Sequence, residues 1–293
     1  MIQFVKRKIL FLTIGSITVI SAILIIGVFG LKPGIDFTGG SISEVTSSSV
    51  NEDEFMSKIR DSFAAKEIEV SSIQRSGDSN VLIKSKELSQ EVWGEIQSNI
   101  GETYDDVTEV SFETIGPTLG QELLRKTGFA VVVAALSLLV YIAWRFENKM
   151  YGITAVMAMV HDVLVILASF ALFGYFWGVE IDVMFVTAAL TALAFSVHDT
   201  VVLYDRVHEV LRRNPKDSFG EVVNTAVNAT LVRSLSTSLT IVLVLTSLLV
   251  LGGDNIRWFV VALLVGTITG AYSSPFIAAP LVVWLEERQS KEK

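Results

Sequence analysis

Residues 194–206 read AFSVHDTVVLYDR, and this stretch places Asp199 inside an apolar segment that ends at Asp205 and Arg206. The length and composition of the surrounding segment are typical of a membrane-spanning helix. A carboxylate near the centre of such a helix disfavours insertion by about 2.5–3.5 kcal/mol and is retained where function or assembly requires it. The stretch therefore predicts a membrane fold in which another residue partners Asp199.

The composition of the whole chain also indicates a membrane protein. Of its 293 residues, 51% are hydrophobic and only 18% are charged, which is too apolar for an ordinary soluble protein of this length. The chain has no cysteine, so disulfides and thiolate metal sites are excluded. The net charge of -8 is concentrated in residues 34–122, which hold 18 acidic and 6 basic side chains. Nothing in this charge pattern favours a nucleic-acid partner.

Six apolar segments are long enough to cross a bilayer, which takes about 20 residues. The first lies within residues 1–33 and follows a basic amino terminus, without the short core and cleavage site of a signal peptide. The other five are predicted at residues 123–144, 151–176, 182–204, 226–251 and 258–285. The architecture expected is a polytopic α-helical membrane protein with a short tail at residues 286–293.

The distribution of lysine and arginine predicts the orientation of these spans. Basic residues gather before the first span, after the second, after the fourth and in the tail, all on one side of the membrane. The loops at residues 178–182 and 252–255 lie on the other side and carry no lysine or arginine. By the positive-inside rule both termini are cytoplasmic, and residues 34–122 are outside.

Residues 34–122 predict a small α+β domain. Strand patterns at residues 40–47, 69–75, 80–85 and 106–114 alternate with helical patterns at residues 51–66 and 89–100. Asn51 is the expected cap of the first helix, and residues 76–79 read SGDS, a hairpin signal. The order βαββαβ is that of the ferredoxin-like fold.

Ionisable residues recur at one depth of the predicted bundle. At about 1.5 Å of rise per residue, Asp199 and Arg233 each lie roughly 9 Å to the cytoplasmic side of the centre of their spans. His161 and Asp162 lie near the middle of the third span. We expect Asp199 and Arg233 to form an ion pair facing the bundle interior, next to the hydroxyl-rich residues 234–240.

Structural interpretations of these residues remain open. The ion pair could serve only to lock helices together, and the His161–Asp162 pair could be a hydrogen-bond clamp between spans. His198 could face lipid headgroups or a neighbouring helix. Gly266 and Gly270 form a small-xxx-small motif on the sixth span, which favours close helix packing.

A metal hydrolase is disfavoured because the sequence has no HExxH motif and no third ligand near either His-Asp pair. We therefore expect no metal, no cofactor and no enzymatic activity.

Residues 34–40, GIDFTGG, resemble the signature that opens the outer domain of SecD and SecF proteins, and residues 115–120, IGPTLG, resemble the segment that leads SecF back into the membrane. Residues 196–206, 231–240 and 271–280 are similar to SecF in order and spacing. The single short outer domain resembles SecF more than SecD. The signature residues are Gly34, Asp36, Phe37, Gly39, Gly40, Gly116 and Pro117.

The resemblance implies half of an RND-type transporter in a bacterial or archaeal cytoplasmic membrane. It implies a SecD-like partner, the SecYEG channel, YajC and YidC as further partners, a preprotein in transit, and protons. The function implied is promotion of late preprotein translocation by the proton-motive force. The alternative is half of an RND-like exporter of lipids or small molecules, which predicts a larger outer domain.

The resemblance also assigns roles to single residues. The family's intramembrane proton-pathway aspartate corresponds to Asp199 and its arginine to Arg233. Asp162 matches a His-Asp motif that includes His161. Where most members have Asn before the aspartate, this chain has His198, whose side chain titrates near neutral pH and could join the pathway.

Overall fold

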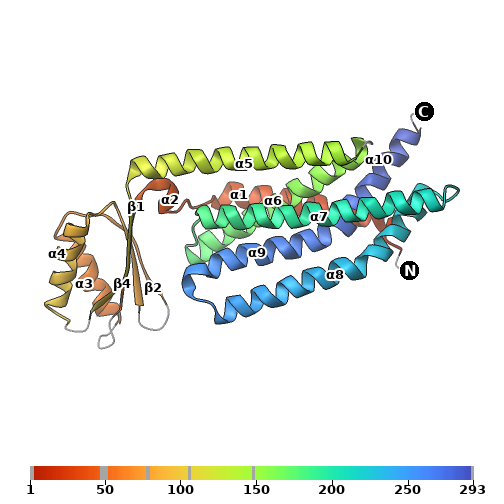
Figure 1. Cartoon of the computed structure of the whole chain (residues 1–293). Helices are drawn as coiled ribbons and strands as arrows, with labels where there is room; N and C mark the ends of the chain where they lie inside the picture. Colours follow the sequence, from red (N-terminus) through yellow and green to blue (C-terminus); the bar gives the residue numbers. More distant parts are fainter. Residues whose placement is uncertain (1–2, 47–51, 77–79, 105–106, 147–148, 292–293) are drawn as a thin grey trace. The chain divides into compact units, whose positions relative to one another are not determined.

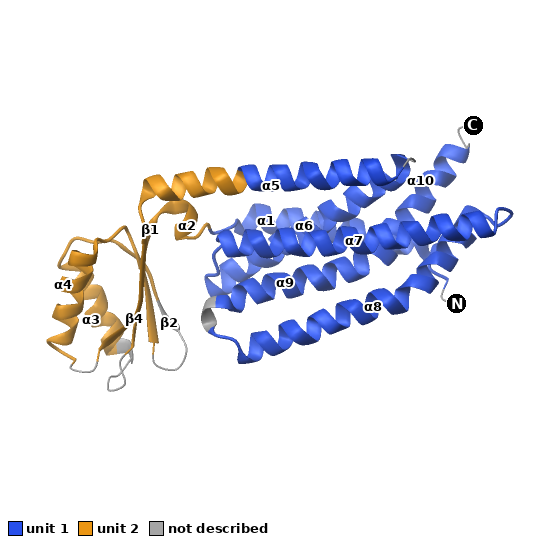
Figure 2. Ribbon diagram, in the orientation of Figure 1, with its two compact units in different colours: residues 1–32, 129–293 blue, residues 33–128 orange. Residues whose placement is uncertain are grey.

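The computed structural model describes residues 3–46, 52–76, 80–104, 107–146 and 149–291 (Figure 1). The chain divides into two compact units, one of residues 33–128 and one of residues 1–32 with 129–293 (Figure 2). The predicted cap Asn51 and residues 77–79 of the predicted hairpin turn lie outside the described residues.

Residues 33–128 form an α+β unit with a four-stranded sheet. After the short helix α2 (Ile35–Thr38), the elements are β1 (Gly40–Thr46), α3 (Glu52–Ala64), β2 (Val70–Ser76), β3 (Asn80–Ser85), α4 (Gln90–Gly101) and β4 (Thr108–Ile115). The sheet order is β2-β3-β1-β4, and every neighbouring pair is antiparallel. This topology confirms the ferredoxin-like fold expected from the sequence.

The core of this unit lies between the sheet and the two helices. The helical spacing of Phe55, Ile59 and Phe63 puts all three into the buried cluster, where they meet Trp93 of α4. The Trp93 ring stacks on Phe112 with a centroid separation of 5.6 Å. A buried indole needs an acceptor for its N–H, and Trp93 Nε1 donates to Glu109 at 2.8 Å.

The signature glycines allow a close backbone contact within the same unit. Gly39 has φ +74°, and a Cβ there would lie 2.8 Å from Pro117 Cα. A Cβ at Gly120 would lie 2.8 Å from the Gly39 backbone nitrogen. No side chain fits at either position, so the segments at residues 34–40 and 115–120 meet because both contain glycine.

The second unit is helical. Its elements are η1 (Val5–Arg7), α1 (Lys8–Phe29), the part of α5 (Pro117–Arg145) from residue 129, α6 (Lys149–Trp177), α7 (Val183–Arg213), α8 (Phe219–Leu251), α9 (Asp254–Ser273), η2 (Ser274–Ala278) and α10 (Ala279–Lys291). Within the described residues, six helical segments are long and apolar enough to span a membrane, which confirms the expected membrane architecture.

The helices are longer than the apolar segments predicted from the sequence. α7 continues past Tyr204 to Arg213, because Val207 and Val210 keep one face of the extension buried. α8 begins at Phe219 rather than at residue 226, after a capping box in which the side chains of Ser218 and Glu221 bond to each other's backbone N–H. Hydropathy therefore gives the apolar part of these helices and not their ends.

The sixth span, predicted at residues 258–285, is interrupted within the membrane segment. It consists of α9, a π-helical turn at η2, and α10. Pro275 lies within the turn and has no backbone N–H, so it cannot continue a regular hydrogen-bond ladder.

α7 lies centrally among α6, α8 and α9. A Cβ at Gly266 of α9 would lie 2.2 Å from the Cβ of Ala192, and one at Gly270 would lie 2.9 Å from the Cβ of Ser196. The two glycines, four residues apart, thus bring the backbone of α9 against one face of α7.

Candidate functional site

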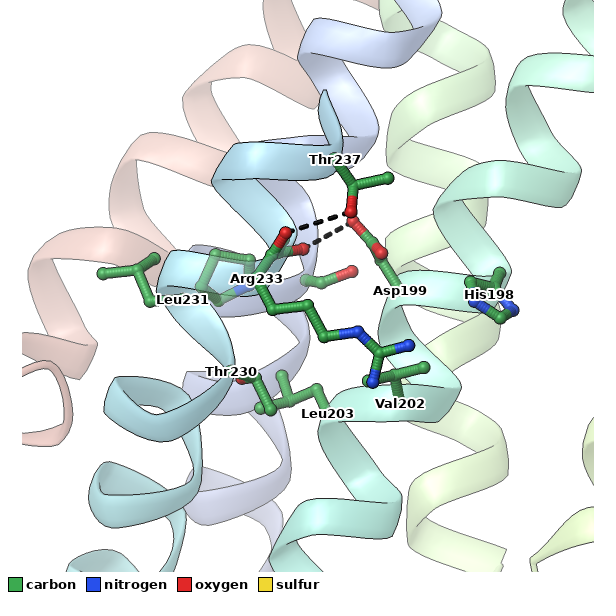
Figure 3. A pocket seen from close by; sticks show the side chains of 11 residues that line it. His198, Asp199, Val202, Leu203, Thr230, Leu231, Arg233 and Thr237 are labelled. Carbon is green, nitrogen blue, oxygen red and sulfur yellow. Dashed lines mark hydrogen bonds between the residues drawn. The ribbon is translucent and has the colours of Figure 1, made fainter. Parts of the chain in front are cut away.

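Asp199 lies on α7 and is hydrogen-bonded to α8. The Ser234 hydroxyl donates to Asp199 Oδ2 at 2.6 Å. Asp199 is half-buried, whereas Arg233 and His198 are exposed within the chain. Asp199 and Arg233 line one cavity of about 120 Å³ between α7, α8 and η2 (Figure 3). The other residues that line it are His198, Val202, Leu203, Thr230, Leu231, Ser234, Thr237, Ser274 and Pro275.

Asp199 and Arg233 do not form the ion pair expected from the sequence, among the residues that the structure describes. The serine that follows Arg233 meets the carboxylate instead, and the Arg233 carbonyl accepts a hydrogen bond from Thr237 at 3.0 Å. Figure 3 shows the Arg233 side chain extending across the cavity toward α7 near Val202. The acid and the guanidinium therefore share one cavity without direct contact.

Asp162 is the more deeply buried carboxylate, with 1% of its surface exposed. It accepts hydrogen bonds from the hydroxyls of Ser196 on α7 and Ser273 on α9, the latter at 2.8 Å. Its Oδ1 lies 2.9 Å from His161 Nδ1. Three partners on three helices compensate for the loss of hydration around the carboxylate.

Two of these partners make further contacts. His161 Nε2 lies 3.5 Å from the Tyr272 hydroxyl, so both nitrogens of this buried ring face polar atoms. The Ser273 hydroxyl also lies 3.4 Å from the Gly270 carbonyl oxygen, one turn earlier on α9.

A second, smaller cavity lies between Ser196 and Asp199. It measures about 40 Å³ and is lined by Phe195, Ser196, His198, Asp199, Thr237, Ser238, Ile241, Gly266, Thr267, Gly270 and Ala271. This volume exceeds the roughly 10–15 Å³ that one water needs, and Ser196, Asp199 and Thr237 supply polar atoms within a mostly apolar lining. Ser196, which donates to Asp162, lines this cavity together with Asp199. The hydrogen-bond donor of one carboxylate therefore borders the same cavity as the other carboxylate.

A face of buried hydroxyls continues along α7. Thr200 lies 2.8 Å from the Ser274 hydroxyl, and Tyr204 lies 2.6 Å from the Thr154 hydroxyl. With Ser196 these residues recur every four positions, so they project from one side of the helix. α7 thus bears two polar surfaces, one facing α6 and α9 and the other, at Asp199, facing α8.

His198 lines both cavities, and within the described residues its side chain makes no hydrogen bond. Figure 3 shows its ring directed away from the Arg233 side chain. No group of three or more His, Cys, Asp or Glu side chains that could hold a metal occurs among the described residues.

Sequence reasoning found the two aspartates and Arg233 but did not single out their hydrogen-bond partners. Ser234 belongs to the hydroxyl-rich residues 234–240, and Ser196 follows Ala188 and Ala192 at helical spacing on a face of mostly small residues, so the sequence held a signal for both. Ser273 required knowledge of how α9 lies against α6, which the sequence does not contain.

Comparisons with known proteins agree with this fold. The family "Protein export membrane protein SecD/SecF, C-terminal" matches residues 95–288, and the "SecD/SecF GG Motif" matches residues 24–49. The chain is 35% identical to protein translocase subunit SecF of Thermobaculum terrenum, over 98% of this chain and 95% of that one. It is 34% identical to SecF of Anaerolinea thermophila, over 97% and 94% of the two chains.

Longer proteins contain a similar region. Protein translocase subunit SecDF of Bacillus subtilis is 33% identical over 96% of this chain and 37% of its own length. The crystal structure of SecDF from Thermus thermophilus, a translocon-associated membrane protein, has a TM-score of 0.85 at 28% identity and covers 98% of this chain. This chain spans 39% of that SecDF chain and nearly the whole of the separate SecF chains. The chain belongs to the SecF family, the accessory membrane subunits of the Sec protein-export machinery.

Proposed function

We propose that this chain acts with a SecD-like partner to draw preproteins outward through the SecYEG channel, driven by the proton-motive force. The observation that carries the proposal is the half-buried Asp199, which shares a cavity with Arg233 and is bonded to Ser234 of the neighbouring helix. The SecDF relatives, in which one chain extends well beyond this region, support a SecD-like partner.

Protonation of Asp199 would change how α7 and α8 interact. A charged carboxylate accepts the Ser234 hydrogen bond strongly and attracts the guanidinium across the cavity. A neutral carboxyl group holds both more weakly, which lets α8 shift relative to α7. One charge moving through 100 mV supplies about 2.3 kcal/mol, enough to bias a two-state element.

Asp162 and His161 would extend the proton pathway from Asp199 into the buried interior of the helical unit. Ser196 donates to Asp162 and borders the small cavity that Asp199 also lines. A proton could therefore pass from Asp199 to Asp162 through water and one hydroxyl, with His161 as a second basic group beside it. His198 would serve at the edge of the larger cavity, which it lines together with Asp199.

The orientation proposed follows the positive-inside rule, with both termini cytoplasmic and residues 34–122 outside. The ferredoxin-like unit would then face the side to which preproteins are exported. A movement of α8 or of its neighbours could be passed to this unit through the covalent links at α1 and α5.

The partners proposed are a SecD-like subunit, the SecYEG channel, YajC, YidC and the preprotein. No observation favours an exporter of lipids or small molecules.

The proposal is tested by preprotein export into membrane vesicles that contain this chain, a SecD-like partner and SecYEG. In Asp199→Asn the part of export that depends on the proton-motive force should be lost. Asp205→Asn is the matched control, because Asp205 lies on the same helix and pairs with Arg145 away from the cavity. Unchanged proton-driven export in Asp199→Asn would refute the proposal.

A further inference from the structure

We propose that an anionic glycerophospholipid binds in a groove between the start of α1 and the middle of α8. The groove has a volume of about 500 Å³ and is lined by Gln3, Phe4, Arg7, Phe11, Leu231, Leu235 and Phe276. It is separate from the cavity that contains Asp199 and Arg233, apart from Leu231, which borders both.

The floor and walls of the groove are apolar. Three aromatic rings pack together where α1 meets η2, with centroids 5.0 Å apart for Phe11 and Phe276 and 5.5 Å apart for Phe4 and Phe276. On the opposite side Leu235 of α8 is 53% exposed within the chain. In a bilayer, an apolar hollow of this kind gains dispersion contacts when hydrocarbon fills it.

The mouth of the groove is basic. Arg7 is exposed and, among the described residues, has no ion-pair partner, whereas the adjacent Lys8 pairs with Glu287. The guanidinium is suited to bidentate recognition of a phosphate, and the Gln3 amide at the same mouth can donate as well. Phe11 follows Arg7 by one helical turn, or about 6 Å along the axis. A lipid could therefore place its phosphate at Arg7 and the start of an acyl chain at Phe11.

Charge complementarity decides between possible occupants. A transmembrane helix of a partner could fill the apolar part, but it would leave Arg7 without a counter-charge. An anionic lipid supplies both a phosphate and a chain, and basic pockets between membrane helices are known to select such headgroups. A zwitterionic lipid offers the same chains without a net negative charge.

The position of the groove gives the bound lipid a consequence for α8. Leu231 and Leu235 line the groove, while Arg233 and Ser234 between them line the Asp199 cavity. A lipid in the groove therefore packs against α8 beside Ser234, which bonds to Asp199, and beside Arg233.

The test uses the full chain with its SecD-like partner in nanodiscs that contain equal amounts of phosphatidylglycerol and phosphatidylcholine. Native mass spectrometry after release from the disc counts the lipids of each kind that the protein retains. The chain should retain phosphatidylglycerol preferentially. Arg7→Gln should reduce that preference about tenfold, as expected for loss of a charge-assisted contact. Leu235→Trp, which fills the groove, should lower retention of both lipids.

Lys6→Gln is the matched control, since it removes the same charge one residue away, and Lys6 borders a different cavity. It should leave the preference unchanged, and thermal unfolding should show that all three variants fold. Equal losses in Lys6→Gln and Arg7→Gln would mean diffuse attraction to the membrane and would overturn the proposal. Equal retention of the two lipids by the unaltered chain would also overturn it. The same measurement is made on the chain without its partner: lipid that is retained there but not in the complex would assign the groove to a partner helix and would overturn the proposal as well.

Discussion

The hydroxyl of Ser234 donates to the carboxylate of Asp199 at 2.6 Å, and this bond joins α8 to α7 at the edge of the cavity that Arg233 also lines. The direct partner of the intramembrane acid is therefore a neutral hydroxyl. The Arg233 guanidinium lines the same cavity as a longer-range partner and is not in direct contact with the acid.

Ser234→Ala should lower proton-driven export about tenfold, since a hydrogen bond to a charged group is worth about 1.5–3 kcal/mol. Ser234→Thr keeps the hydroxyl and should retain most of the activity. Export into vesicles gives the measurement. Ser247→Ala serves as the control, because the Ser247 hydroxyl bonds to the Leu243 carbonyl of its own helix. Equal activity in all three variants would remove Ser234 from the pathway.

Substitutions of Asp162 should separate its structural role from a role in proton transfer. Asp162→Ala leaves the hydroxyls of Ser196 and Ser273 without their acceptor and should cost about 1–3 kcal/mol of stability. Asp162→Asn keeps an acceptor oxygen and should unfold closer to the unaltered chain while export is lost. The measurements are thermal unfolding in detergent and export into vesicles. Normal export by a stable Asp162→Asn protein would confine Asp162 to holding α6, α7 and α9 together.

Gly266→Ala should destabilise the helical unit, because the new Cβ would overlap that of Ala192 at 2.2 Å. Overpacking of this kind costs about 1–3 kcal/mol, and Ala192→Gly in the same chain should restore most of it. Thermal unfolding provides the readout. Gly128→Ala is the control, since a Cβ at Gly128 of α5 meets nothing within 4 Å. A Gly266→Ala protein as stable as Gly128→Ala would show that α9 and α7 do not approach this closely.

Gly39→Ala should destabilise the ferredoxin-like unit, because Gly39 has φ +74° and its Cβ would lie 2.8 Å from Pro117 Cα. Strain of this kind costs on the order of 1–3 kcal/mol. Limited proteolysis of the full chain, read at sites within residues 33–128, should show faster cleavage. Gly94→Ala in α4 meets nothing within 4 Å and should slow cleavage or leave it unchanged. Identical cleavage of both variants would contradict the close contact at Gly39.

Periodicity and hydropathy predicted the elements of the fold. The spacing of Phe55, Ile59 and Phe63 gave helix α3 and its buried face, and six apolar runs gave the membrane helices. They could not give the ends of α7 and α8, because a helix continues wherever one face stays buried, as at Val207 and Val222.

The candidate site could be predicted only in part. Asp199 and Arg233 stood out because a charged side chain inside an apolar segment raises the free energy of membrane insertion. Such a residue can be recognised from the sequence alone. Which donor meets each carboxylate depends on the rotation and register of neighbouring helices, and the sequence does not contain these. The π-helical turn at Ser274–Ala278 had a marker in Pro275, but a proline alone does not tell a kink from a π-turn.

The Ser273 hydroxyl carries one proton and lies near two acceptors, Asp162 Oδ2 at 2.8 Å and the Gly270 carbonyl at 3.4 Å. It cannot serve both fully at once. The carboxylate is the nearer acceptor, and the same hydroxyl lies beside the backbone of α9 just before the turn that contains Pro275. One serine thereby connects the buried carboxylate of α6 to the place where α9 stops being a regular α-helix.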